Sequence, residues 1–165
     1  MLFRSTAGDE ANAYASLDRV FSAPGEGKLA VFARVGFDEN SPAVTLYGTG
    51  QVGATQYIFA IRYDVVAQEL SYRDAASNYQ VIGSSLILGM AAFDWYPFLL
   101  VVDLATGYYV RAIVNNTEYD LSAYTMESGV SGTAPTGEVL VWSSAVGAAG
   151  GTFYVDDIIV VKNVP

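Results

Sequence analysis

Short runs of Val, Ile, Tyr, Phe and Thr recur along the whole chain, and each run ends at Gly, Asn, Asp, Ser or Pro. No long stretch repeats apolar residues with the 3.6-residue period of an amphipathic helix. Short runs of this composition, bounded by turn residues, are typical of β-strands. The pattern therefore predicts an all-β protein. The predicted strands are residues 2–6, 13–22, 28–37, 43–48, 56–65, 69–73, 79–82, 96–104, 108–114, 117–121, 138–143 and 152–162.

Turn residues between the runs predict how neighbouring strands pair. In the DLATG turn, Gly107 stands where a tight hairpin needs a positive φ, and Asn115 with Asn116 forms a two-residue turn. These turns predict an antiparallel meander over residues 96–121. The AASN turn predicts a further hairpin over residues 69–82.

The number of predicted strands indicates the architecture. About a dozen strands are too many for one open sheet, so we expect an antiparallel β-sandwich of two sheets packed face to face. No linker, repeat or change of composition divides the chain, which predicts a single domain over residues 1–165. The Gly-rich segments 126–136 and 143–151 are predicted loops that are candidates for binding or contact.

The order of the strands also resembles a known family. The segment WYPFLLVVDLATGYYVRAIVNNTEYDLSAY, followed by EVLVWSS and GTFYVDDIIVVK, resembles the C-terminal half of a concanavalin A-like lectin/glucanase jelly roll, a superfamily that includes laminin-G-like domains. The segment AYASLDRVFSAPGEGKLAVFARVGF is similar to the opening strand pair of that family. The resemblance implies a sandwich of curved sheets whose concave face or loop rim often binds sugars.

Two adjacent aspartates, Asp156 and Asp157, interrupt the last apolar run. Successive strand side chains point to opposite faces, so the two carboxylates cannot share one metal or substrate while the strand stays regular. One interpretation buries Asp157 on the face of Ile159 and Val161, with Asp156 facing solvent. The other interpretation places a local bulge here, which lets one or both aspartates bind a structural Ca²⁺. The sequence predicts no other cofactor.

The residues required for common hydrolytic mechanisms are missing. The chain has no cysteine and no histidine, which removes the commonest general base and the commonest zinc ligand. Glucanases of the superfamily resemble one another in an E-x-D-x-E strand, and this chain has Glu118 and Asp120 but Ser122 at the third position. Retaining hydrolysis needs two carboxyl groups in defined roles. We therefore expect a protein that is not an enzyme, with Glu118 and Asp120 on a solvent-facing strand.

Aromatic side chains are the remaining candidates for ligand binding, because the chain has 12 tyrosines, 8 phenylalanines and 2 tryptophans. A tyrosine presents a flat apolar ring with a polar tip, which suits both sugar stacking and protein contacts. Alternation allows only one of Tyr108 and Tyr109 to lie in the core. The candidate ligand-binding residues are Trp95, Tyr96, Tyr109, Tyr119, Tyr124 and Trp142.

Charge and composition limit the partners. The net charge is -9 and the eight Lys and Arg residues are scattered, which argues against nucleic acid and membrane surfaces. No stretch is long and apolar enough to span a membrane, and MLFRSTAGDEAN lacks the features of an export signal. Hydrophobic residues make up 52% and charged residues 15%, which favours a further buried contact such as a homo-oligomer or larger assembly.

Two functions follow from these observations. The leading hypothesis is a non-catalytic recognition or adhesion module that binds a glycan or surface polymer through exposed aromatics. The alternative is a structural or assembly protein, such as a surface or phage-virion component, that uses the sandwich for subunit contacts. Both hypotheses predict a protein that is extracellular or lies on a virion or cell surface.

Overall fold

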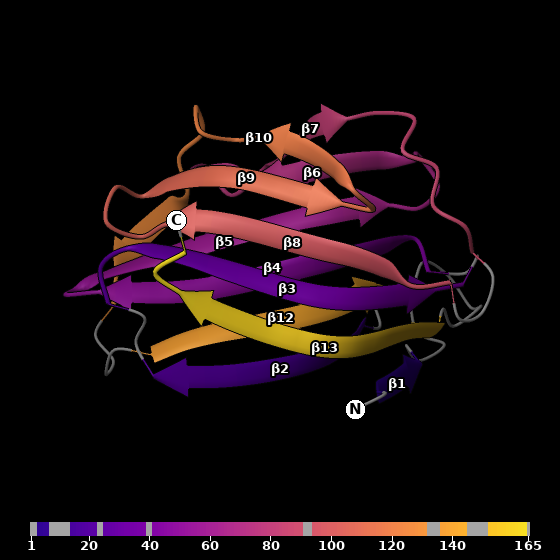
Figure 1. Ribbon diagram of the computed structural model, residues 1–165, viewed down its shortest axis with the longest axis horizontal. Helices are drawn as coiled ribbons and strands as arrows, with labels where there is room; N and C mark the ends of the chain where they lie inside the picture. Colours follow the sequence, from indigo (N-terminus) through magenta and orange to yellow (C-terminus); the bar gives the residue numbers. More distant parts are fainter. Residues whose placement is uncertain are drawn as a thin grey trace.

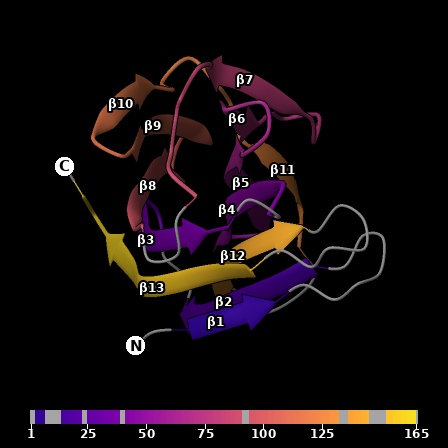
Figure 2. The same cartoon turned by 90° about the vertical axis from the view of Figure 1, so that its right-hand side faces the viewer.

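Two antiparallel β-sheets lie face to face in the computed structural model (Figure 1, Figure 2). The structure describes residues 3–6, 14–22, 25–38, 41–90, 94–131, 136–144 and 152–164, and these ranges contain strands but no helix. The strands are β1 (Phe3–Thr6), β2 (Tyr14–Ser22), β3 (Lys28–Phe37), β4 (Ala43–Val52), β5 (Thr55–Asp64), β6 (Glu69–Arg73), β7 (Tyr79–Gly83), β8 (Tyr96–Asp103), β9 (Tyr108–Val114), β10 (Thr117–Asp120), β11 (Glu127–Val130), β12 (Thr136–Ser144) and β13 (Thr152–Lys162).

Each sheet combines strands that are distant in the sequence. One sheet has six strands in the order β1-β13-β3-β8-β9-β10. The other has seven strands, in the order β2-β12-β4-β5-β6-β7, with β11 paired to β5. In Figure 2 the two sheets form separate layers, with β8, β9 and β10 in one layer and β5, β6 and β7 in the other.

The sequence-based prediction of an all-β sandwich is confirmed. Every predicted strand is present, with end shifts of a few residues, and β8, β9 and β10 form the expected meander. The β6–β7 hairpin is also confirmed. Within the predicted loop 143–151, residues 143 and 144 belong to β12, and residues 145–151 lie outside the described ranges.

The prediction of a loop over residues 126–136 is wrong for its first part, because Glu127–Val130 forms β11. This strand pairs with residues 55–58 of β5, in register from Glu127↔Ile58 to Val130↔Thr55. The segment ESGV has no alternation of apolar and polar residues, so periodicity could not detect it. Its strand conformation comes from the free edge of β5, whose backbone groups need partners.

Alternate side chains of both sheets fill one hydrophobic core. On β4 the inward residues include Val44 and Leu46, and on β5 they include Phe59 and Ile61. Gly48 lies opposite Phe59 in the ladder, and a Cβ at Gly48 would come within 2.3 Å of the Phe59 ring. Glycine is therefore required at this position, since the aromatic ring occupies the space of a side chain.

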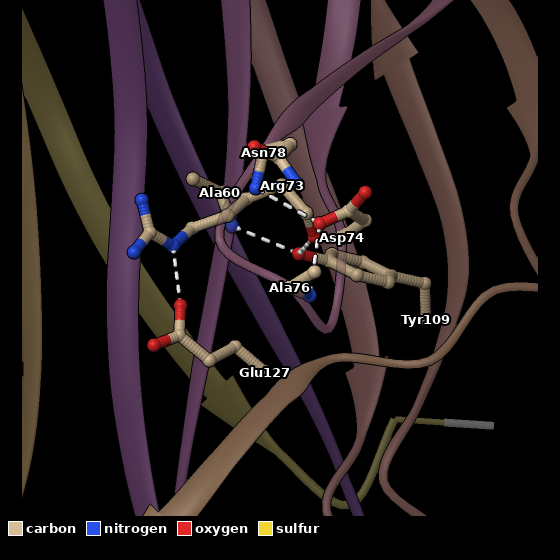
Figure 3. Close-up of polar contacts among 7 residues, drawn as sticks. All are labelled: Ala60, Arg73, Asp74, Ala76, Asn78, Tyr109 and Glu127. Carbon is tan, nitrogen blue, oxygen red and sulfur yellow. Dashed lines mark hydrogen bonds and ion pairs between the residues drawn. The ribbon is translucent and has the colours of Figure 1, made fainter.

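The side chain of Tyr109 joins the two sheets through its hydroxyl group. Tyr109 belongs to β9, and only 1% of its surface is exposed. Its hydroxyl accepts a hydrogen bond from the backbone N–H of Ala60 at 3.1 Å and donates one to the carbonyl of Arg73 at 2.7 Å (Figure 3). Both partners belong to the other sheet, so one side chain satisfies backbone groups that would otherwise be buried without a partner.

These contacts lie where β5 changes its neighbour. The first half of β5 pairs with β11 through residues 55–58, and the second half pairs with β6 from Ile61 onward. Ala60 lies between the two paired segments. The Tyr109 hydroxyl therefore fills an interruption in the ladder of backbone hydrogen bonds.

We expect the Tyr109→Phe variant to be destabilised by about 1–3 kcal/mol, because the buried N–H of Ala60 loses its partner. The measurement is the free energy of unfolding in urea, followed by tryptophan fluorescence. The matched control is Tyr108→Phe at the neighbouring tyrosine, which is 42% exposed and is expected to change stability by less than about 0.5 kcal/mol. Equal stability of the two variants would show that the Tyr109 hydroxyl bonds contribute nothing.

Candidate functional site

The outer face of the seven-stranded sheet carries a row of large side chains. Trp142, Thr45 and Arg62 lie directly opposite one another on β12, β4 and β5. The next row contains Leu140 and Tyr47. All five residues alternate with core residues and therefore point away from the core. We call this surface the aromatic face and define it by Tyr47, Arg62, Arg73, Tyr79, Glu127 and Trp142.

Three half-buried aromatic rings dominate the aromatic face. Trp142, Tyr47 and Tyr79 each keep part of their surface accessible. The guanidinium of Arg62 lies over the Tyr79 ring, 5.4 Å from its centroid. Thr45 is fully buried between the larger side chains. The result is a set of flat rings separated by small or planar polar groups.

An ion pair between Arg73 and Glu127 lies on this face. Arg73 Nε donates to Glu127 Oε2 at 2.7 Å, and both side chains are 22% exposed (Figure 3). Arg73 ends β6 and Glu127 begins β11, so the pair connects the two strands that share the edge of β5. A half-buried charge pair of this kind contributes more to binding or stability than a fully exposed one.

Electrostatics keep the charges on this face paired and the phenols neutral. Burial by itself raises the pKa of Glu127, but hydrogen bonds from Arg73 and Ser77 and the Arg73 charge hold it below its ordinary value. Burial raises the pKa of Tyr47 and Tyr79, although Arg73 lowers both in part. At neutral pH the aromatic face therefore offers neutral hydroxyl groups beside a carboxylate and guanidinium groups.

The aromatic residues that the sequence predicts as ligand-binding candidates do not lie together in the structure. Trp142 lies on the aromatic face. Tyr96 begins β8 in the other sheet, and Trp95 directly precedes it. Tyr119 lies on the edge strand β10, and Tyr124 lies between β10 and β11. These four residues do not converge with Trp142 on one face. Their roles in ligand binding stay predictions.

The assignment of Tyr109 to a ligand site is corrected. Its ring lies in the core and its hydroxyl is used by Ala60 and Arg73, so it has no surface to offer a ligand. Tyr108 is exposed instead, which confirms that only one of the two neighbours lies in the core.

Sequence reasoning missed Tyr47, Tyr79, Arg62 and Arg73 as candidates. For Tyr47 a signal was present, because it alternates with Val44 and Leu46 and must point away from the core. Their convergence, however, depends on the pairing of β4, β5, β6 and β7.

The two adjacent aspartates lie at a β-bulge in β13. Asp156 pairs with Arg34, the next regular pair is Ile159 with Phe32, and Asp157 has a φ of 53°. The additional residue reverses the side-chain alternation beyond it. Consequently, the interpretation that buries Asp157 on the face of Ile159 is wrong, because Asp157 is exposed and Asp156 is half-buried. The alternative interpretation, a local bulge, is confirmed.

Both carboxylates take Arg34 as a partner, at 2.9 Å for Asp156 and 2.5 Å for Asp157. The expectation that the two carboxylates point to opposite faces applied to a regular strand, and the bulge lets both of them reach one cation. Among the described residues, no group of three or more acidic side chains is arranged to hold a metal ion. Calcium at Asp156 and Asp157 stays a prediction, and the guanidinium of Arg34 supplies positive charge at this position.

The acidic pair on β10 lies in the other sheet from the aromatic face. Glu118 and Asp120 are exposed on this edge strand, which confirms the predicted solvent-facing position. Asp120 accepts a hydrogen bond from the Ser122 N–H at 2.9 Å, and the pKa of Asp120 is lowered by its bonds to Ser122. Asp120 therefore acts as a turn cap.

Comparison with known proteins identifies the fold. No family model and no curated protein matches the sequence. The chain is similar to the potassium-bound carbohydrate recognition domain of Emp46p, with a TM-score of 0.62 and 9% identity over 98% of this chain and 84% of that chain. It is also similar to a prokaryotic β-1,3-1,4-glucanase (lichenase) from a mouse hindgut metagenome, with a TM-score of 0.55 and 12% identity over 99% of this chain and 80% of that chain.

A third similar structure is a sialidase, with a TM-score of 0.61 and 9% identity over 98% of this chain, which spans 15% of the length of that protein. Together these likenesses show that the fold is a concanavalin A-like jelly-roll β-sandwich. The set contains both a recognition domain and a glucanase, so the shared fold does not distinguish binding from catalysis.

Within the described residues, no helix has the length and apolarity needed to cross a membrane.

We expect the stabilising effect of the Arg73–Glu127 pair to depend on pH. Since the pKa of Glu127 is lower in the folded protein than its ordinary value of 4.5, the pair stabilises the fold above that pH. This contribution is lost as the pH falls through the folded-state pKa. The melting temperature of Glu127→Gln should therefore be lower than that of the wild type at neutral pH, and the difference should shrink in acid.

The control for this experiment is Glu118→Gln, because Glu118 is exposed and its nearest guanidinium nitrogen, on Arg111, lies 4.0 Å away. This variant is expected to change stability by at most about 1 kcal/mol. A difference for Glu127→Gln that stays constant from neutral to acidic pH would contradict the assignment.

Proposed function

We propose that the protein is a non-catalytic recognition module that binds a carbohydrate chain across the aromatic face. Such a module acts outside the cell or on the surface of a cell or virion. The observation that carries the proposal is the set of half-buried rings of Trp142, Tyr47 and Tyr79, interspersed with Arg62 and the Arg73–Glu127 pair.

This arrangement suits the chemistry of a sugar. The C–H groups on one side of a pyranose ring pack against an aromatic face, while its hydroxyl groups need hydrogen-bond partners. The face extends from β12 to β7, which is four strand spacings or roughly 19 Å at about 4.8 Å per spacing. A surface of this extent fits an oligosaccharide better than a single sugar. The printed descriptions of the similar Emp46p domain and lichenase also concern carbohydrate.

The state of Glu127 favours binding over hydrolysis. A glycosidase acid needs a raised pKa, so that the carboxyl group carries a proton at the pH of the reaction. Glu127 has a lowered pKa and is bonded to Arg73. It is therefore suited to accept hydrogen bonds from sugar hydroxyl groups through its free lone pairs.

The test is isothermal titration calorimetry against a panel of soluble plant, microbial and animal polysaccharides. We expect saturable binding to at least one of them, and about tenfold weaker binding for Trp142→Ala, since lost aromatic stacking costs about 1–1.5 kcal/mol. Tyr108→Ala is the control, because Tyr108 is exposed on β9 in the other sheet. Release of reducing ends is measured in the same samples.

The proposal fails if no polysaccharide binds, or if Trp142→Ala and Tyr108→Ala bind as tightly as the wild type. Release of reducing ends at a rate that Glu127→Gln abolishes would replace recognition with catalysis.

A second function, assembly through subunit contacts, is favoured by the outer face of the six-stranded sheet. Ile159, Phe32, Leu99 and Ile113 lie opposite one another in a continuous row across β13, β3, β8 and β9. The bulge at Asp157 turns Ile159 outward, where it is 47% exposed. A connected apolar row on a sheet surface is typical of a protein contact.

For this second function we expect the wild type to form oligomers in sedimentation-velocity experiments and Ile159→Lys to reduce them. The control Ile87→Lys changes a side chain that is 72% exposed outside the strands, and it should leave the distribution unchanged. A wild type that stays monomeric at high concentration would exclude self-assembly through this row.

A further inference from the structure

A pocket lies apart from the aromatic face, at the turn between β6 and β7. Its volume is about 270 Å³, and it is formed by Tyr72 at the end of β6, the turn residues from Asp74 to Ala76, and the segment from Ala123 to Thr125 before β11. Figure 3 shows Asp74 and Ala76 on this turn. Residues distant in the sequence therefore meet around one small, open pocket.

Tyr72 contributes a hydroxyl group to the lining of the pocket. The residue is only 7% exposed, and its ring packs against Tyr109 at 5.5 Å and against Tyr124 at 4.5 Å between ring centroids. No hydrogen bond to the Tyr72 hydroxyl is found in the described part of the chain, although this oxygen is not sealed from solvent. Because Tyr72 lines the pocket, its hydroxyl is available to a bound molecule.

The only charged side chain that lines the pocket among the described residues is the carboxylate of Asp74. Its Oδ1 accepts hydrogen bonds from the N–H groups of Ala76 at 2.9 Å and Asn78 at 2.8 Å, and its Oδ2 accepts one from Gln80 at 2.8 Å. These bonds, with that from Gln80 the strongest, keep the pKa of Asp74 below its ordinary value. The carboxylate is therefore ionised and held in position.

The guanidinium of Arg73, the cation nearest to Asp74 in the sequence, points away from the pocket. Arg73 precedes Asp74, but its guanidinium is bonded to Glu127 on the outer face of the sheet, whereas Tyr72 faces the core side. The pocket is thus lined by one fixed carboxylate and two phenol rings, whose faces carry negative charge density. Ala75, Ala76 and Ala123 leave room for a small organic group.

We propose that this pocket binds a small organic cation, a protonated or methylated amine, through the Asp74 carboxylate, the Tyr124 ring and the Tyr72 hydroxyl. The ammonium group pairs with Asp74 and packs against the face of the Tyr124 ring, as cations do on tyrosine rings. The Tyr72 hydroxyl accepts the remaining N–H of a primary amine, or faces the substituent of a methylated one. This site does not depend on carbohydrate binding at the aromatic face.

The experiment uses the full chain and three probes: choline, glucosamine and glucose. Glucosamine and glucose differ in the amino group at one carbon, so the pair isolates the effect of the charge. Binding is followed by the shifts of alanine methyl signals in NMR spectra, at constant ionic strength with sodium chloride as the blank. We expect choline and glucosamine to shift the signals of Ala75, Ala76 and Ala123 with dissociation constants on the order of 1 mM, and glucose to shift none of them.

Two variants test the residues. Asp74→Asn keeps an oxygen for the N–H groups of the turn but removes the charge, and it should weaken binding of the cations at least tenfold. Tyr124→Ala should weaken it about two- to fivefold. The matched control is Asp120→Asn, which removes an exposed carboxylate that also caps a turn but does not line the pocket, and it should bind as the wild type does.

Equal binding of glucose and glucosamine would overturn the proposal and make the pocket a neutral sugar site. Absence of shifts with choline and glucosamine in the wild type would also overturn it, and this result needs no variant to fold. Loss of polysaccharide binding at the aromatic face would leave the choline and glucosamine shifts unchanged, so the two proposals fail separately.

Discussion

Strand β5 changes its neighbour from β11 to β6, and the ladder of backbone hydrogen bonds is interrupted between the two paired segments. At this interruption the hydroxyl of Tyr109, from the other sheet, accepts a hydrogen bond from the backbone N–H of Ala60. A buried N–H without a partner costs roughly 1–3 kcal/mol. Fixing Ala60 and the carbonyl of Arg73 with one hydroxyl avoids that cost and sets the separation of the two sheets at this point. The same ring packs edge-on against Tyr72, which lines the pocket at the β6–β7 turn.

The aromatic face depends on this junction. Arg73 has its carbonyl bonded to Tyr109 on one side, and its guanidinium reaches Glu127 on the other. The Arg73 guanidinium lowers the pKa of both Tyr47 and Tyr79, against the larger effect of burial, which raises it. Arg73 therefore connects core and surface, because its backbone carbonyl binds Tyr109 in the core and its guanidinium binds Glu127 on the aromatic face.

The bulge at Asp157 shows where reasoning from sequence alone fails. Strict alternation along β13 predicts Ile159 in the core with Phe153, and one additional residue reverses this prediction. A positive φ at an aspartate is uncommon, but its short polar side chain tolerates the left-handed region. The adjacent aspartates allowed a bulge as one of two interpretations, but the choice between them depends on ion pairs with Arg34, which belongs to a strand more than a hundred residues away.

The sequence by itself determined the all-β sandwich, the meander and the hairpin, because strand length, turn residues and alternation are local properties of the chain. It also predicted Trp142 as a candidate ligand residue, which lies on the aromatic face. Only the tertiary structure decided that Trp142 is joined there by Tyr47 and Tyr79, that Tyr109 lies in the core, and that ESGV forms a strand. These outcomes depend on which strands become neighbours, and in an antiparallel sandwich most neighbours are distant in sequence, so their pairing is set by the packing of the whole core.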